Sequence, residues 1–149
     1  MKKEQVLETL KLPGRQISRE VLAEIRDNPK LYKPELLKIL KREASKPQNP
    51  AARVEYNDWL YSLYILAEFR EKDAFKSAIK LFSRKGNFLN PLTGDIVLQN
   101  LGPIFASVAN GNTTDLMKMI EDVGINEYCR ASAIEALVIM VEIGEYARE

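Results

Sequence analysis

A chain of 149 residues has the size of one domain, and its 46% hydrophobic and 29% charged residues exclude a disordered chain. With one cysteine and no histidine, it can form neither an internal disulfide nor a structural zinc site, and catalysis by imidazole is excluded. The net charge of +1 is unevenly distributed along the chain. Residues 1–90 contain 19 Lys/Arg and 12 Asp/Glu, a net charge of +7, whereas residues 91–149 contain 3 Lys/Arg and 9 Asp/Glu, a net charge of −6.

The first 49 residues predict three amphipathic helices, because apolar residues recur every three to four positions. The first helix covers about residues 6–10 and stops before Pro13, since proline and the glycine after it disfavour continuation. Ser18 can accept a hydrogen bond from the amide of Val21, which predicts the start of the second helix there. The third helix is expected after Pro34.

Residues 50–149 predict a longer series of helices. The first covers about residues 51–71, and its centre is apolar nearly all round, so several of its sides must be covered. Capping residues and glycines predict five further helices, which are Asp73 to Phe82, about Asp95 to Asn100, Pro103 to Val108, Thr113 or Thr114 to Val123, and Glu127 to Ile143 before Gly144. Because no segment shows sustained strand-like alternation, the sequence predicts an all-α fold.

A weak internal repeat links two of these helix pairs. Residues 65–69 match residues 104–108 at an offset of 39, and residues 75–79 match residues 116–120 at an offset of 41. Repeats of about 40 residues are typical of proteins in which stacked helix pairs bury a continuous core. The spacing favours stacked antiparallel helix pairs in a HEAT/armadillo-like right-handed superhelix. A helical bundle without superhelical stacking stays open as an alternative.

Five sequence blocks carry a family resemblance, and they are Asp58–Leu63, Leu66–Ala74, Gly94–Val97, Leu101–Val108 and Asn126–Ala133. In this order they resemble an uncharacterised bacterial family with a HEAT-like helical domain. The resemblance covers about residues 50–149 and implies that these residues form the family's helix pairs, preceded by N-terminal helices over residues 1–49 of the same domain. Members of that family sometimes end in a cysteine-rich SEC-C motif, which this sequence lacks. The resemblance implies no established activity.

No residue pattern indicates a catalytic or cofactor site. Glycine-rich phosphate loops are absent, and Cys129 is interpreted as a buried packing residue beside an apolar helix. Glu55 and Asp58 lie one helical turn apart and could bind a divalent ion. An enzyme that uses these carboxylates and a metal is therefore one hypothesis, the least favoured of three. Carboxylates held in salt bridges are more common. We therefore predict a protein without enzymatic activity, cofactor or metal. Lacking a secretory signal and any run of about 20 apolar residues, it is expected in the cytoplasm and away from membranes.

Aromatic residues on one predicted helix are the first candidates for binding. Tyr56, Trp59, Tyr61 and Tyr64 gather there, and such side chains either fill a core or anchor a protein partner. Some of this surface should be exposed, since a helix cannot hide all its sides in a two-layer stack. The aromatic group favours a protein–protein interaction or scaffold module of unknown partner.

Basic residues in the first half give a second hypothesis. Lys38, Lys41 and Arg42 could contact phosphates, which makes weak nucleic-acid binding the alternative function. The near-zero net charge and the interleaved acidic residues argue against it, so nucleic acid is an unfavoured partner. Arg130, at the start of the last helix, is expected to be structural and to form an ion pair between neighbouring helix pairs.

The last predicted helix carries more apolar side chains than one inward-facing stripe requires. They are Ile134, Leu137, Val138, Ile139, Met140, Val141 and Ile143. A terminal helix of a stack usually presents a polar outer face. We expect the surplus to be covered by a second copy, in a homodimer through this C-terminal helix, or by a segment missing at a truncated C-terminus. The resemblance favours the missing segment.

Overall fold

The computed structural model describes residues 1–12, 17–46, 58–84 and 99–145. Within these ranges the chain forms eight α-helices, one 3₁₀ turn and no β-strand, so the predicted all-α fold is confirmed. The elements are α1 (Lys3–Lys11), α2 (Arg19–Asp27), α3 (Pro29–Ser45), α4 (Asp58–Glu68), η1 (Lys72–Ala74), α5 (Phe75–Phe82), α7 (Leu101–Ala109), α8 (Thr114–Glu121) and α9 (Glu127–Glu142). None of the described helices is long and apolar enough to cross a membrane. The helix expected near residues 95–100 lies mostly outside the described residues.

Helix α2 begins where its capping residue predicts, whereas α3 begins earlier than expected. Oγ of Ser18 accepts a hydrogen bond from the amide of Val21 at 3.2 Å, which satisfies one of the donors that a first turn leaves unpaired. Helix α3 starts at Pro29, not after Pro34. Pro29 occupies the first helical turn, where a missing N–H costs nothing, and Pro34 removes only one bond, to the carbonyl of Lys30.

Two other helix starts are capped by residues other than those predicted. At the start of η1, which leads directly into α5, the side chain of Glu71 accepts a hydrogen bond from the amide of Asp73 at 3.2 Å. Before α8, Oδ1 of Asn112 accepts from the amide of Asp115 at 3.4 Å, whereas Thr113 forms no side-chain cap. Asp73 therefore lies inside η1, whereas Thr113 occupies the predicted N-cap position of α8 but makes no capping bond.

Helices α4 and α9 both end in a turn whose second residue is left-handed. After α4 this residue is Arg70, with φ 52°, and after α9 it is Gly144, with φ 80°. In each turn two successive amides donate to carbonyls of the last helical turn, at 3.0 and 2.9 Å after α4 and at 3.2 and 2.8 Å after α9. The predicted stop at Gly144 is confirmed, but α4 ends at Glu68, three residues early, because Arg70 leaves the helical conformation.

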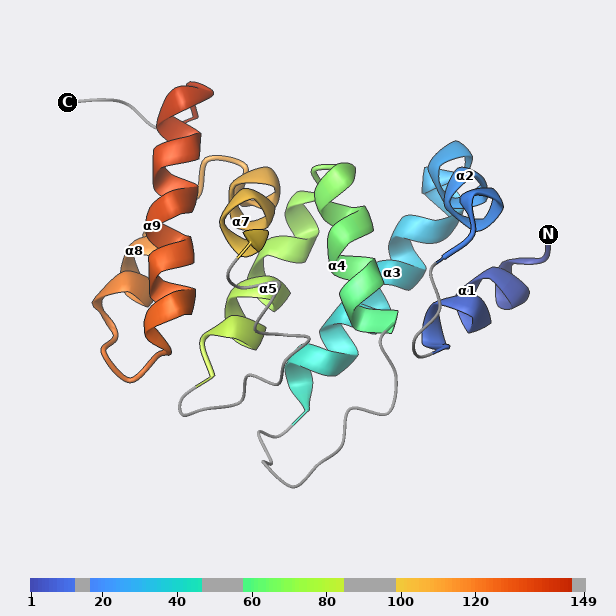
Figure 1. Ribbon diagram of the computed structural model, residues 1–149, viewed down its shortest axis with the longest axis horizontal. Helices are drawn as coiled ribbons and strands as arrows, with labels where there is room; N and C mark the ends of the chain where they lie inside the picture. The colour runs from blue at the N-terminus through green and yellow to red at the C-terminus, as the bar shows by residue number, and fades with distance from the viewer. Residues whose placement is uncertain (13–16, 47–57, 85–98, 146–149) are drawn as a thin grey trace.

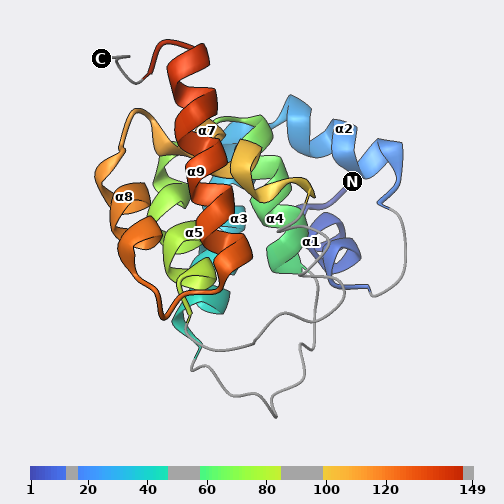
Figure 2. The ribbon, with the colours of Figure 1, turned by 60° about the vertical axis from the view of Figure 1, so that its left-hand side comes forward.

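The helices lie in two rows along the long axis of the molecule (Figure 1, Figure 2). One row contains α4, α7 and α9, each in contact with the next, and the other contains α3, α5 and α8. Contacts between the rows join α3 to α4, α5 to α7 and α8 to α9. Helices α1 and α2 lie at one end of the molecule, and α8 and α9 at the other. The two copies of the sequence repeat coincide with α4–α5 and α7–α8.

The core lies between the two rows. Phe82 of α5 and Phe105 of α7 are fully buried and meet edge to face, with ring centroids 6.1 Å apart. Leu63 of α4 is fully buried as well, in agreement with a helix that is apolar on nearly every side. Within the α4–α7–α9 row, the hydroxyl of Ser107 donates to the carbonyl of Ala67 at the end of α4. Polar as well as apolar contacts therefore hold neighbouring helices together.

Candidate binding groove

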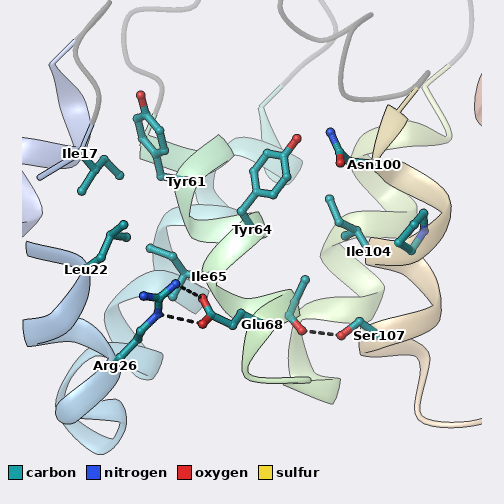
Figure 3. Close-up of a pocket in the computed structure, with 12 residues that line it drawn as sticks. Ile17, Leu22, Arg26, Tyr61, Tyr64, Ile65, Glu68, Asn100, Ile104 and Ser107 are labelled. Carbon is teal, nitrogen blue, oxygen red and sulfur yellow. Dashed lines mark hydrogen bonds and ion pairs between the residues drawn. The ribbon is translucent and has the colours of Figure 1, made fainter. Parts of the chain in front are cut away.

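A groove with a volume of about 950 Å³ lies between α2, α4 and α7 (Figure 3). Helix α4 forms its floor, and α2 and α7 form its two walls. Most of the lining side chains are apolar or aromatic, with a few polar groups among them. This is the composition expected of a concave binding site rather than of a solvated helix surface.

The floor of the groove is one line of side chains along α4. Tyr61, Tyr64, Ile65 and Glu68 are spaced by three or four residues, so they project from the same side of the helix. Other sides of α4 are covered by contacts with α1, α3 and α7. The remaining side is therefore the one on which the two tyrosines, each half-buried, meet solvent.

The walls repeat this helical spacing. On the α2 side, Leu22 and Arg26 are four residues apart, and Ile17 lies just before the helix. On the α7 side, Ile104 and Ser107 are three residues apart. The floor, from Tyr61 to Glu68, covers about two helical turns, so the groove extends over roughly 10 Å.

Polar groups mark the two ends of the groove. At one end Arg26 and Glu68 form a double ion pair, with Nε to Oε1 at 2.8 Å and Nη2 to Oε2 at 3.2 Å, which joins α2 to α4. The hydroxyls of Tyr61 and Tyr64 point away from this pair (Figure 3). Burial raises the pKa of Tyr64, and a hydrogen bond with Asn100 opposes part of that rise. Tyr64 therefore keeps its proton at neutral pH and can donate a hydrogen bond to a ligand.

The four predicted aromatic residues divide between groove and core. Tyr61 and Tyr64 line the groove. Trp59 is only 4% exposed and belongs to the core. It precedes Tyr61 by two positions, which places it on the opposite side of the helix. Tyr56 lies outside the described residues.

The predicted basic residues lie on α3 and do not line the groove. Lys38 is 3.8 Å from a carboxylate oxygen of Glu35, and Arg42 is 2.8 Å from one of Asp58. Lys41 is exposed. Two of the three cations thus face a carboxylate of the same chain, which weakens the positive field that a phosphate group would meet.

Only Asp58 of the proposed carboxylate pair lies within the described residues. Asp58 is fully buried and paired with Arg42, as expected of a salt-bridged carboxylate, while Glu55 lies outside the described residues. Across the described ranges, no group of three or more His, Cys, Asp or Glu side chains could hold a metal ion.

Cys129 and Arg130, at the start of α9, both have structural surroundings. Cys129 is fully buried, and burial raises the pKa of its thiol to about 12, which confirms a packing role. Arg130 donates from Nε to the carbonyl of Ile120 at 2.9 Å. This contact differs from the predicted ion pair, because α8 ends beside α9 with carbonyls that its own helix leaves unpaired.

The sequence prediction misses the walls of the groove, including Leu22, Asn100 and Ile104. One signal could have found α7, since Ile104 is equivalent to Ile65 in the internal repeat and both residues line the groove. No comparable signal exists for Leu22, because α2 is not part of the repeat.

Comparison with known proteins gives a family but no activity. Residues 1–149 match the model of a family described as "Protein of unknown function (DUF1186)". An uncharacterised protein of Chlamydia trachomatis serovar D is 34% identical over 116 residues, which is 78% of this chain and 46% of that protein. One of Chlamydia muridarum is 34% identical over 115 residues, 77% of this chain and 46% of that protein. The chain thus spans about half the length of these relatives. No solved structure matches it.

Proposed function

The chain belongs to the DUF1186 family of proteins of unknown function, as its resemblance to an uncharacterised bacterial family predicts, and we propose that it is a non-catalytic module that binds a segment of another protein. The observation that carries the proposal is the tyrosine-lined apolar groove between α2, α4 and α7. It offers half-buried aromatic side chains at its floor, and such residues are frequent anchors of protein interfaces.

The shape of the groove suits a short peptide segment. Its length of roughly 10 Å corresponds to about two turns of an α-helix or three residues of extended chain. Apolar side chains of the segment would lie between Leu22 and Ile104, while the hydroxyl of Tyr64 and the amide of Asn100 can bond to its polar groups. The segment would therefore be anchored by apolar contact and oriented by hydrogen bonds.

The arrangement of the helices supports a HEAT-like interpretation of the module. Two rows of helices, with the sequence repeat matching α4–α5 to α7–α8, agree with stacked helix pairs. Stacks of this kind commonly bind extended segments along their helices. The polar groups of the groove also favour binding over catalysis, because the Ser107 hydroxyl already donates to a carbonyl and Glu68 is held by Arg26.

Peptide selection tests this function. Random peptides of about 12 residues displayed on phage would be selected on the full chain, and enriched peptides synthesised for affinity measurement. We expect apolar or aromatic residues at helical or alternating spacing. The substitution Tyr64→Ala should weaken binding by at least about tenfold, since it removes an anchor of the floor.

The matched control is Tyr128→Ala, which removes an exposed tyrosine of α9 far along the chain from the groove and should leave affinity unchanged. Thermal melts would verify that both variants fold. Peptides that bind the Tyr64→Ala protein as tightly as the unchanged chain, or a selection that enriches none, would contradict the proposed function.

A further inference from the structure

The outer side of α9 presents an apolar stripe to solvent. Ile134 is 51% and Val138 53% exposed, one turn apart on the helix, and Ala131 is exposed one turn before them. The inner side of the same helix packs through Cys129 and Met140, which are fully buried. The surplus of apolar residues predicted for this helix is therefore real, and part of it has no cover from the described residues.

The position of α9 indicates what kind of element fits beside it. In the row of α4, α7 and α9, each helix packs against the next, and α9 is the end of the row (Figure 1). A helix lying along the outer side of α9 would continue this packing. The stripe therefore has the surroundings of a helix–helix interface with one helix absent.

The charges at the ends of the stripe limit the choice of helix. Glu127, Ala131, Ile134, Val138 and Glu142 follow one another at intervals of three or four residues, so they form one line along α9. Both glutamates are exposed. The line is thus apolar in its centre and acidic at both ends, over roughly 22 Å.

Two neighbouring charged residues do not alter this pattern. Glu135 faces α7, where a Cβ on Gly102 would lie only 2.5 Å from its Oε2 atom. Arg130 lies toward α8 and donates to the carbonyl of Ile120. Arg130 therefore does not neutralise the acidic ends of the stripe, and Glu135 is itself acidic.

We propose that this face of α9 docks a basic amphipathic helix of a partner protein. The helix would place apolar side chains on Ala131, Ile134 and Val138, and Lys or Arg about two turns to either side, near Glu127 and Glu142. Pairing of two copies through α9 is disfavoured, because in either orientation it would bring acidic ends of the two lines together. The face is separate from the groove, so either proposal can fail without the other.

A pair of designed peptides tests the proposal on the full chain. Each has about 18 residues and the same apolar stripe, but one carries Lys and the other Glu at both ends. Fluorescence anisotropy should show the Lys peptide binding at least about tenfold more tightly than the Glu peptide. The double substitution Ile134→Ser with Val138→Ser should abolish this binding, and Tyr64→Ala in the groove should leave it unchanged.

The decisive variant exchanges the charges of the face. With Glu127→Lys and Glu142→Lys together, we expect the preference to reverse toward the Glu peptide, an outcome that a merely structural role for α9 would not produce. Equal binding of both peptides, or no reversal, would overturn the proposal. Sedimentation provides a second test, since a concentration-dependent dimer that Val138→Ser abolishes would make a second copy the occupant.

Discussion

Leu63 is a buried side chain whose role in the core can be tested directly. It is fully buried in α4, which contacts α1, α3 and α7. We expect Leu63→Ala to lower the free energy of unfolding by roughly 2–5 kcal/mol, because the lost apolar contacts leave a cavity that the neighbouring helices cannot close. Urea or thermal denaturation would measure it.

Val138→Ala is the control for this substitution. Its side chain is half exposed on α9, so the change should stay within about 0.5 kcal/mol. A loss at Leu63 no larger than at Val138 would mean that α4 is peripheral to the fold.

The thiol of Cys129 should be inert in the folded protein. Its pKa of about 12 leaves almost no thiolate at about pH 8, and the side chain is fully buried. A disulfide reagent such as DTNB should therefore label the native chain slowly and the unfolded chain at once. Complete labelling of the native chain at the unfolded rate would show that α9 is not packed as described.

The same thiol makes stability depend on pH in alkaline solution. Unfolding returns the pKa of Cys129 to its ordinary value of 9.0. Between pH 9.0 and about 12 the unfolded chain therefore holds fewer protons than the folded chain, and this group's contribution lowers the free energy of unfolding as pH rises.

At the scale of single elements, the cap of α2 gives a prediction of moderate size. Replacing Ser18 by Ala removes the acceptor that bonds to the amide of Val21 at 3.2 Å, and should cost about 1 kcal/mol of stability. Thr113→Ala is a matched control, because Thr113 precedes α8 without a side-chain cap. If urea denaturation shows the same loss of stability in both variants, the loss at Ser18 is not caused by the missing cap.

Local chemistry explains which helix boundaries the sequence predicts. Ser18 and Gly144 act through their own turns, so both boundaries are readable from neighbouring residues. The end of α4 is not, because Arg70 adopts a left-handed conformation that its residue type disfavours. The early start of α3 could not be predicted, because proline usually interrupts a helix and Pro34 lies inside this one.

Only the floor of the candidate groove could be predicted from the sequence, and not its walls. Apolar spacing identifies Tyr61 and Tyr64 as one face of a helix, but α4 is apolar nearly all round, and the sequence does not tell which side stays uncovered. Leu22 and Ile104 lie on opposite sides of the groove, with α4 between them (Figure 3). Their placement depends on how three helices pack, and helical periodicity carries no information about that packing.

For the whole molecule, the ion pairs predict weak binding of nucleic acid. Lys33 and Lys46 are 3.3 and 3.1 Å from carboxylates of their own chain, as Lys38 and Arg42 are from others. Filter binding of a labelled oligonucleotide at moderate salt should give a Kd no tighter than about 10 µM. Submicromolar binding that Lys38→Glu and Lys41→Glu together abolish would instead make α3 a nucleic-acid surface.

The ion pair between Arg70 and Glu145 ties the first helix of the α4–α7–α9 row to the last. The two residues are 75 positions apart; Arg70 lies in the turn that ends α4, and Glu145 directly follows Gly144 at the end of α9. Most other contacts join elements close in sequence, so local segments can fold before this tie closes. We therefore expect it to form late in folding, after α7 and α9 have joined α4.

A late contact affects unfolding more than folding. Substituting Arg70 by Ala keeps the left-handed backbone and removes the ion pair, at a cost of about 1 kcal/mol. Stopped-flow measurements should therefore show unfolding roughly fivefold faster and refolding unchanged. Slower refolding would mean that the two ends of the row meet early, and that the chain collapses around this tie instead of growing one helix at a time.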